Sequence, residues 1–201
     1  MPSVYDVKPR FQALLRPLVA RLVRSRVTAN QVTLAAMMLS VFTGGIIALF
    51  KSKGVLLLLP MVLLVRMAMN AIDGMLAREH GQKTALGGLL NELGDVISDI
   101  ALYLGLVPPL QAPVLLVAIV LAAITGELAG IAAVTIGATR RYDGPMGKSD
   151  RALAFGILAV VAGVGHPAHW EIQAWLSAIL VLAVATVWNR CRCALKEIGN
   201  A

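Results

Sequence analysis

Charged residues are scarce in this sequence: they make up 14% of 201 residues, whereas soluble domains usually contain about 25%. This deficit excludes an ordinary water-soluble domain, because a chain of this length still exposes much of its surface after folding. Hydrophobic residues reach 58%, and several apolar runs have the roughly 20 residues that a helix needs to cross the hydrocarbon layer. The sequence therefore predicts an all-α membrane protein.

Cysteine is also scarce, and the sequence contains two, Cys191 and Cys193. A single C-x-C pair is a poor metal site, and we expect two reduced thiols. The sequence also lacks a linker, a low-complexity tract and a recognisable repeat, which favours one membrane domain over residues 1–201. The N-terminal arginines are spread out rather than grouped before an apolar core, so no signal peptide is expected.

The apolar runs predict six transmembrane helices, which form a bundle over residues 30–189. A basic amphipathic helix over residues 10–26 precedes them, and we expect it to lie in the headgroup plane of the bilayer. Thr28 or Asn30 can cap the first span. The six spans are expected near residues 30–50, 55–78, 84–108, 113–138, 150–165 and 171–189.

The basic residues gather on one side of this six-span arrangement. Fifteen Lys and Arg residues fall in the N-terminal segment, the connections between spans two and three and between spans four and five, and the C-terminus. Lys51 and Lys53 fall on the opposite side. Because positive charge in short loops marks the cytoplasmic side, we predict a multi-pass protein of the bacterial inner membrane with both termini in the cytoplasm. The net charge of +7 then mainly reflects the topology. Membrane lipids are expected partners, and no nucleic-acid partner is expected.

Two neighbouring spans carry polar side chains at helical spacing. Arg66, Asn70 and Asp73 share one face of the second span, and the third span carries a polar side made of Asn91, Glu92, Asp95, Ser98 and Asp99. A tight turn makes the two spans antiparallel neighbours, so we expect their polar faces to meet near the cytoplasmic surface. Such acids cost about 2.5–3.5 kcal/mol each inside a membrane helix, and oxygen ligands of this kind suit Mg²⁺ or Mn²⁺. The alternative is a polar cluster that only sets helix packing.

A longer pattern links the two spans. Residues 73–95 read Asp73-Gly74-x2-Ala77-Arg78-x8-Gly87-x3-Asn91-x3-Asp95. This pattern resembles the signature D-x2-D-G-x2-A-R-x8-G-x3-D-x3-D of the CDP-alcohol phosphatidyltransferases, and every spacing agrees. Residues 27–33 resemble the T-P-N-x-(I/V)-T segment with which that family enters its first membrane helix. Asn70 and Asn91 stand where the signature has its first and third Asp.

The resemblance implies an enzyme that transfers a phosphatidyl or other phospho-alcohol group from a CDP-alcohol to a hydroxyl acceptor and releases CMP, in phospholipid biosynthesis. CDP-diacylglycerol is the expected donor. One or two Mg²⁺ or Mn²⁺ ions are implied, bound to the pyrophosphate near the cytoplasmic face. The implied partners are a CDP-activated lipid and a hydroxyl acceptor, and the sequence is compatible with a homodimer.

The roles of individual residues follow from the same resemblance. Asp73 and Asp95 are the implied catalytic residues and metal ligands, and Asp95 either binds metal or activates the acceptor hydroxyl. Asn70 and Asn91 are implied to be weakened metal ligands. The positions that match the nucleotide pocket are Gly74, Ala77, Arg78 and Gly87. Glu92 and Asp99 lie on the same helix face as Asp95, and we predict that they can substitute as ligands.

The loop between the fourth and fifth spans is basic. Lys148, Arg151, Arg140 and Arg141 are candidates for binding the phosphate of an acceptor or donor, and an ordinary cytoplasmic loop is the alternative. Glu127 is a lone acid in the fourth span, which either neighbours the polar stripe or Arg66, or serves packing. Two other functions stay open: an inactive family member that binds CDP-lipid, and a small ion-coupled transporter.

Overall fold

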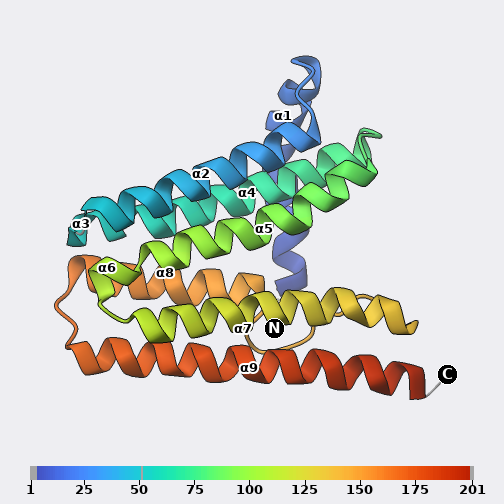
Figure 1. The fold of residues 1–201 in the computed structure, drawn as a ribbon. Helices are drawn as coiled ribbons and strands as arrows, with labels where there is room; N and C mark the ends of the chain where they lie inside the picture. Colours follow the sequence, from blue (N-terminus) through green and yellow to red (C-terminus); the bar gives the residue numbers. More distant parts are fainter. Residues whose placement is uncertain (1–3, 51, 200–201) are drawn as a thin grey trace. The chain divides into compact units, whose positions relative to one another are not determined.

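The structure is a computed structural model that describes residues 4–50 and 52–199, with side chains from residue 11 onward. Helices account for the regular structure of these residues, and no strand occurs among them. The prediction of an all-α protein is confirmed. The helices, shown in Figure 1, are α1 (Val4–Arg24), α2 (Ala29–Phe50), α3 (Lys53–Leu56), α4 (Leu58–Glu79), α5 (Ala85–Gly105), α6 (Val107–Leu110), α7 (Pro113–Ala132), the 3-10 helix η1 (Ala133–Ile136), α8 (Lys148–Val164) and α9 (His169–Gly199).

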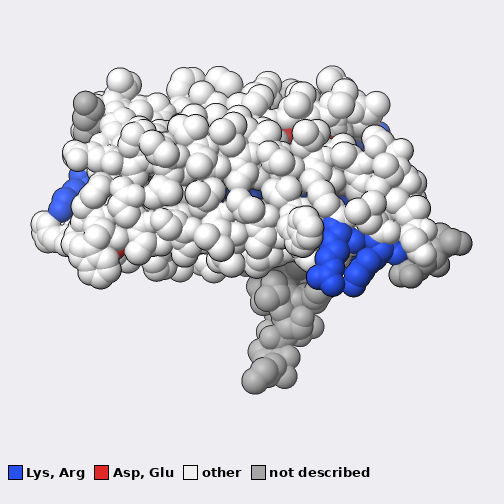
Figure 2. All heavy atoms as spheres, turned by 60° about the horizontal axis from the view of Figure 1, so that its bottom comes forward, with Lys and Arg blue, Asp and Glu red and all other residues white. Residues whose placement is uncertain are grey.

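Five helical stretches in the described part of the chain are long and apolar enough to cross a membrane. They are Ala29–Phe50, Lys53–Glu79, Ala85–Leu110, Pro113–Ile136 and His169–Gly199. Helix α8 has 17 residues, which is shorter than the roughly 20 that a span needs. The count of six spans therefore stays a prediction, and it depends on α8. On the face drawn in Figure 2 most of the described surface is neither acidic nor basic, as expected of helices that face lipid.

Proline explains why the third predicted span ends in a separate short helix. Helix α6 has proline in its first turn, where a missing N–H costs no helical hydrogen bond. The chain then reverses at Gln111, whose φ is 52°, and α7 begins with Pro113. Each predicted span falls on a helix of the structure, and the second, third and fourth each contain a short additional helix at one end.

The described chain forms two compact units, and the boundaries between them fall inside α2, α4 and α5. The first unit comprises Met1–Phe42 and Val62–Ser98, and the second comprises Thr43–Met61 and Asp99–Ala201. The signature positions from Asn70 to Asp95 all belong to the first unit, whereas the basic loop before α8 belongs to the second.

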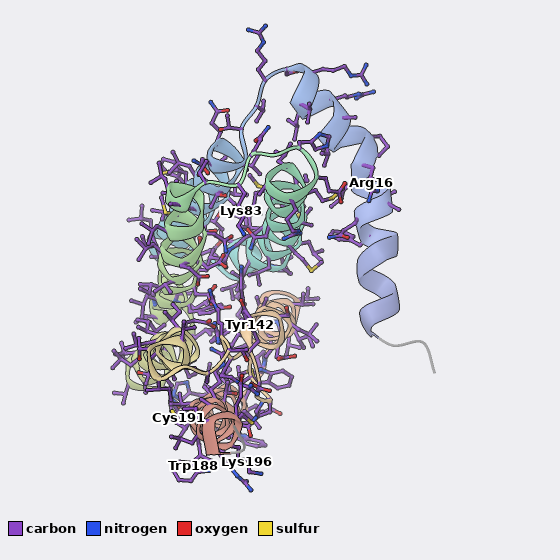
Figure 3. The ribbon with its side chains drawn as sticks, turned by 90° about the vertical axis from the view of Figure 1, so that its right-hand side faces the viewer. Arg16, Lys83, Tyr142, Trp188, Cys191 and Lys196 are labelled. Carbon is purple, nitrogen blue, oxygen red and sulfur yellow. The ribbon has the colours of Figure 1, made fainter. Side chains whose placement is uncertain are left out.

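In the first unit, α1 packs by its apolar side against α2 and α4. Val19 is buried in one cluster with Val32 and Met75, and Leu15 and Leu22 pack against that cluster. An ion pair of 2.9 Å between Arg16 and Glu79 joins α1 to the end of α4, and Figure 3 shows Arg16 on the side of α1 toward that helix. A helix does occupy the predicted segment, ending at Arg24, and part of its apolar face contacts protein. Its location in the headgroup plane stays a prediction.

Thr28 caps α2, as the sequence suggested. Its hydroxyl oxygen accepts a hydrogen bond of 3.2 Å from the backbone N–H of Gln31, and the side-chain oxygen of Gln31 accepts one of 2.9 Å from the Thr28 N–H. This reciprocal pair is a capping box, which satisfies two of the backbone donors that a helix start leaves without partners. The cap sets where α2 begins and therefore where Asn30 and Thr33 lie.

In the second unit, α7 and α9 run side by side (Figure 1). Helices α2 and α5 meet at two glycines in this unit. A methyl group on Gly44 would overlap the backbone carbonyl of Ala101, and one on Gly105 would lie 2.5 Å from the carbonyl oxygen of Gly44. The two backbones are therefore in direct contact, as small residues allow between membrane helices.

Candidate active site

Asp95 of α5 is held from α4 by two side chains. Arg66 donates a hydrogen bond of 3.0 Å to the Asp95 backbone oxygen and one of 3.3 Å to its Oδ1 atom. Asn70 Nδ2 lies 3.4 Å from the same Oδ1 atom. Arg66 is 4% exposed, so its guanidinium is held inside the protein beside the last signature position. The two polar faces predicted from helical spacing do meet at this point.

Asp73 is held from α2. Thr33 Oγ1 donates a hydrogen bond of 2.8 Å to Asp73 Oδ2, and the same hydroxyl lies 3.1 Å from the backbone oxygen of Ala29. Asp73 is 6% exposed, and a buried carboxylate needs such donors because an isolated charge is costly away from water. Thr33 had no predicted role, although it lies in the segment that resembles the family's entry to its first membrane helix.

Two signature glycines leave room for polar side chains. A methyl group on Gly74 would lie 2.7 Å from an Arg78 guanidinium nitrogen, and one on Gly87 would lie 2.6 Å from Asn30 Oδ1. Arg78 therefore folds back along α4 over Gly74, and Asn30 of α2 approaches α5 at Gly87. In the first turn of α5, the Gly87 backbone N–H donates a hydrogen bond of 2.9 Å to Thr84 Oγ1. These glycines bring a cation and an amide close to the backbone.

The turn between α4 and α5 is tied to the start of α2 by Gln82. Its Oε1 atom accepts a hydrogen bond of 2.7 Å from the backbone N–H of Ala29, and its Nε2 atom lies 3.5 Å from the Val27 oxygen. Lys83 follows in the same turn, and Figure 3 labels it there. Gln82 is thus a positioning residue that the signature does not include.

The remaining signature positions lie in the same unit. Asn91 is partly buried on α5, as is its neighbour Glu92, which is not a signature position. Ala77 is partly buried and packs against the apolar cluster of α1, α2 and α4, so its small side chain serves helix packing here. Their predicted roles as ligands or in nucleotide binding stay predictions.

The donor set at the signature positions fits a divalent metal in its chemistry. Carboxylate oxygens from Asp73 and Asp95 and amide oxygens from Asn70 and Asn91 are ligands of the type that Mg²⁺ and Mn²⁺ accept. Among the residues that the structure describes, no group of three or more His, Cys, Asp or Glu side chains could hold a metal ion. The set is therefore suited to a metal but poor in negative charge.

A second charged cluster lies in the second unit. Arg151 of α8 forms ion pairs with Asp99 of α5 at 3.0 Å and with Glu127 of α7 at 3.1 Å. Arg190 of α9 lies 3.3 Å from the other oxygen of Glu127 and donates a hydrogen bond of 2.6 Å to the backbone oxygen of Gly126. Two arginines and two carboxylates thus balance one another inside the protein. Glu127 thus shares Arg151 with Asp99 of the polar stripe, in keeping with one of its predicted alternatives, and Arg190 is its second cation.

This cluster changes how two predicted site residues are interpreted. Asp99 is engaged with Arg151, and Arg151 also donates a hydrogen bond of 3.2 Å to the Met146 backbone oxygen. A phosphate that binds Arg151 would have to compete with two carboxylates. The predicted ligand role of Asp99 and the predicted phosphate-binding role of Arg151 therefore both require that this cluster opens.

The basic loop before α8 is built around Arg141. Its guanidinium bonds Asp143 Oδ2 at 2.7 Å and Glu197 Oε2 at 2.8 Å. The hydrogen bond from Arg141 holds the pKa of Asp143 below its ordinary value. Arg140 lies 4.8 Å from the centre of the Tyr142 ring, and Lys148 opens α8 after a cap in which the Gly147 N–H donates to Asp150 at 3.0 Å. Arg141 thus supports the loop through two acidic partners.

Comparisons with known proteins agree with the signature. A family model described as CDP-alcohol phosphatidyltransferase matches residues 26–189. The chain is 47% identical over 196 residues to the inner membrane protein YnbA of Escherichia coli (strain K12), covering 96% of each protein.

Solved structures share the fold. Phosphatidylinositol phosphate synthase PgsA1 of Mycobacterium tuberculosis, in complex with manganese and citrate, superposes with a TM-score of 0.77 at 21% identity, over 91% of this chain and 90% of that one. The same protein with CDP-DAG bound gives a TM-score of 0.72 at 22% identity, over 89% of this chain and 92% of that one.

Proposed function

The chain belongs to the CDP-alcohol phosphatidyltransferase family, and we propose that it transfers a phosphatidyl group from CDP-diacylglycerol to a hydroxyl acceptor, with release of CMP. One observation carries this proposal: Asp73 and Asp95, at the signature spacing, are held within one unit by donors from two neighbouring helices. A lipid-linked donor is supported by the PgsA1 structure that contains CDP-DAG.

The residues of this chain would bind and orient the reactants. Arg78 beside Gly74 offers a cation to a phosphate, and Asn30 beside Gly87 offers an amide to the nucleotide. Thr33 and the pair Arg66 and Asn70 hold the two carboxylates in place, which lowers the cost of organising the site during the reaction. A bound Mg²⁺ or Mn²⁺, held by Asp73, Asp95 and the amide oxygens of Asn70 and Asn91, would neutralise the pyrophosphate charge.

The transfer itself is a displacement at phosphorus. The acceptor oxygen forms a bond to the phosphorus nearer the lipid, the bond from that phosphorus to the CMP oxygen breaks, and the acceptor hydroxyl loses its proton. Asp95 is the proposed recipient of this proton, because Arg66 and Asn70 fix the direction of its carboxylate. Lys148, Arg151, Arg140 and Arg141 remain the proposed phosphate-binding candidates, as cations in or next to the loop before α8.

We place the protein in the bacterial inner membrane with both termini in the cytoplasm, on the basis of its basic loops and of the E. coli relative. The site lies at the ends of α4 and α5 that are joined by the turn containing Lys83, which this topology puts on the cytoplasmic side. Such a location suits a donor whose acyl chains lie in lipid and whose nucleotide lies in water.

A CMP-release assay tests the proposal. Purified protein is mixed with CDP-diacylglycerol, Mg²⁺ or Mn²⁺, and a panel of glycerol phosphate, inositol phosphate, serine and lipid alcohols. Release of CMP with one acceptor is expected, and Asp73→Asn should abolish it. Glu171→Gln is the matched control, because that carboxylate caps α9 through the Ala168 N–H and should leave the rate unchanged.

Asn70 and Asn91 favour a second candidate, a protein that binds CDP-lipid without turnover. It predicts tight binding of CDP-diacylglycerol and no CMP with any acceptor or metal. Equal activity of wild type and Asp73→Asn would contradict the transferase mechanism proposed here.

A further inference from the structure

We propose that Arg66 takes the place of a second divalent cation at this site, so that the protein binds one Mg²⁺ or Mn²⁺ per chain. This inference rests on the proposed function, since it concerns the metal of the same site. It makes Arg66 a positioning residue that acts through Asp95.

The geometry at Asp95 supplies the first argument. Arg66 contacts both the backbone oxygen and the carboxylate of Asp95, at 3.0 and 3.3 Å. Two contacts to one residue fix the guanidinium better than a single ion pair does. A positive group at the Asp95 carboxylate offsets part of its charge, which leaves enough for one metal ion and too little for a second.

Burial supplies the second argument. Arg66 lies inside the span Lys53–Glu79 and is 4% exposed. An arginine in that position is costly unless a partner faces it, and its guanidinium cannot lose its proton to escape the cost. The charge is therefore permanent, in contrast to that of a metal ion, which binds and leaves.

The charge balance supplies the third argument. The signature has four Asp positions, and this chain fills two of them with Asn70 and Asn91. Two lost carboxylates correspond to the charge of one divalent ion. Arg66 then adds a positive charge next to one of the two carboxylates that remain. With Asp73, Asp95 and the neighbouring Glu92 as the acidic groups, and Arg66 among them, the site has less negative charge for a second divalent ion than the four-Asp signature provides.

The number of bound ions tests the proposal without any measurement of activity. Full-length protein in lipid nanodiscs is titrated with Mn²⁺, with and without CDP-diacylglycerol, and free Mn²⁺ is followed by its electron paramagnetic resonance signal. We expect one bound Mn²⁺ per wild-type chain. Two would overturn the proposal and leave the proposed function standing, whereas none in either condition would overturn both.

Variants test whether Arg66 limits the number of bound Mn²⁺ ions. The double variant Arg66→Gln/Asn70→Asp removes the cation and restores a carboxylate, and two bound Mn²⁺ are expected. Asn70→Asp alone keeps Arg66 and should still bind one. Arg16→Gln is the control, because it removes an arginine from an exposed ion pair of the same unit, and one ion is expected. A second ion in Asn70→Asp, or one ion in a folded double variant, would overturn the role of Arg66.

Discussion

Arg151 and Asp99 form an ion pair of 3.0 Å in which both side chains are more than nine-tenths buried. Glu127 contacts the same guanidinium and connects it to Arg190. Four side chains from α5, α7, α8 and α9 therefore form one charge-balanced group. Removing any one member leaves the others with a net charge inside the protein, which is the situation that burial penalises most.

Arg151→Met is expected to destabilise the protein by about 3–5 kcal/mol, the usual cost of removing one partner of a buried ion pair. Adding Asp99→Asn should recover part of this loss, because the double variant also removes the carboxylate that lost its arginine. Thermal unfolding in detergent, followed by tryptophan fluorescence, measures both. Arg192→Met is the control, since Arg192 is exposed and should be neutral. Additive losses in the double variant would contradict this account.

Thr33→Val is expected to lower kcat/KM for CMP release about tenfold or more, because a hydrogen bond to a charged group contributes roughly 1.5–3 kcal/mol. The substitution keeps the shape of the side chain and removes the donor to Asp73. Ser40→Ala is the matched control on α2: its hydroxyl donates to the Ala36 backbone oxygen of the same helix at 2.8 Å. If both variants lose activity equally, Thr33 does not act through Asp73.

Gly44→Ala is expected to destabilise the protein by about 1–3 kcal/mol, the range for forcing an extra carbon into a packed site. The added methyl would collide with the backbone of Ala101, which cannot move aside as a side chain can. Gly45→Ala is the control on the adjacent residue, because a methyl there meets no atom within 4 Å, and it should match or exceed wild-type stability. Thermal unfolding of the two variants side by side decides the matter.

Asp143 should contribute stability that depends on pH. Arg141 lowers its pKa in the folded protein below the ordinary value of 3.8, so the contribution is fully present above about pH 4–5 and is lost as the pH falls through the folded-state pKa. The stability gap between wild type and Asp143→Asn should be constant from pH 7 to 5 and should shrink below pH 4. If the stability difference between wild type and Asp143→Asn shrinks between pH 7 and 5 instead, a group other than Asp143 causes the pH dependence.

The membrane helices followed from the sequence where the apolar runs were long. Helix α9 shows where this failed: its predicted end was 189, but it continues to Gly199. The prediction counted Arg190 among the basic residues that follow the last span. In the structure Arg190 is 2% exposed and bonds the Gly126 carbonyl and Glu127. A basic residue marks the end of an apolar run, but the helix continues when neighbouring chain segments satisfy its charge.

The candidate site was predictable in its residues and not in its contacts. Helical spacing put Arg66, Asn70 and Asp73 on one face, and the signature identified Asp95. Periodicity along one helix gives a direction and says nothing of which side chain lies opposite, so the pairing of Arg66 with Asp95 emerged from the structure. The hydrogen bond from Thr33 to Asp73 was hidden for the same reason.

Gln82 has a consequence for any opening of the nucleotide site. Its one amide holds the first residue of α2 and the turn that precedes α5. The end of α2 that carries Asn30 and the turn that leads to Gly87 are therefore linked through one side chain. In the proposed reaction, a nucleotide that displaces one of them would also disturb the other, so entry and departure of CMP would depend on a side chain outside the signature.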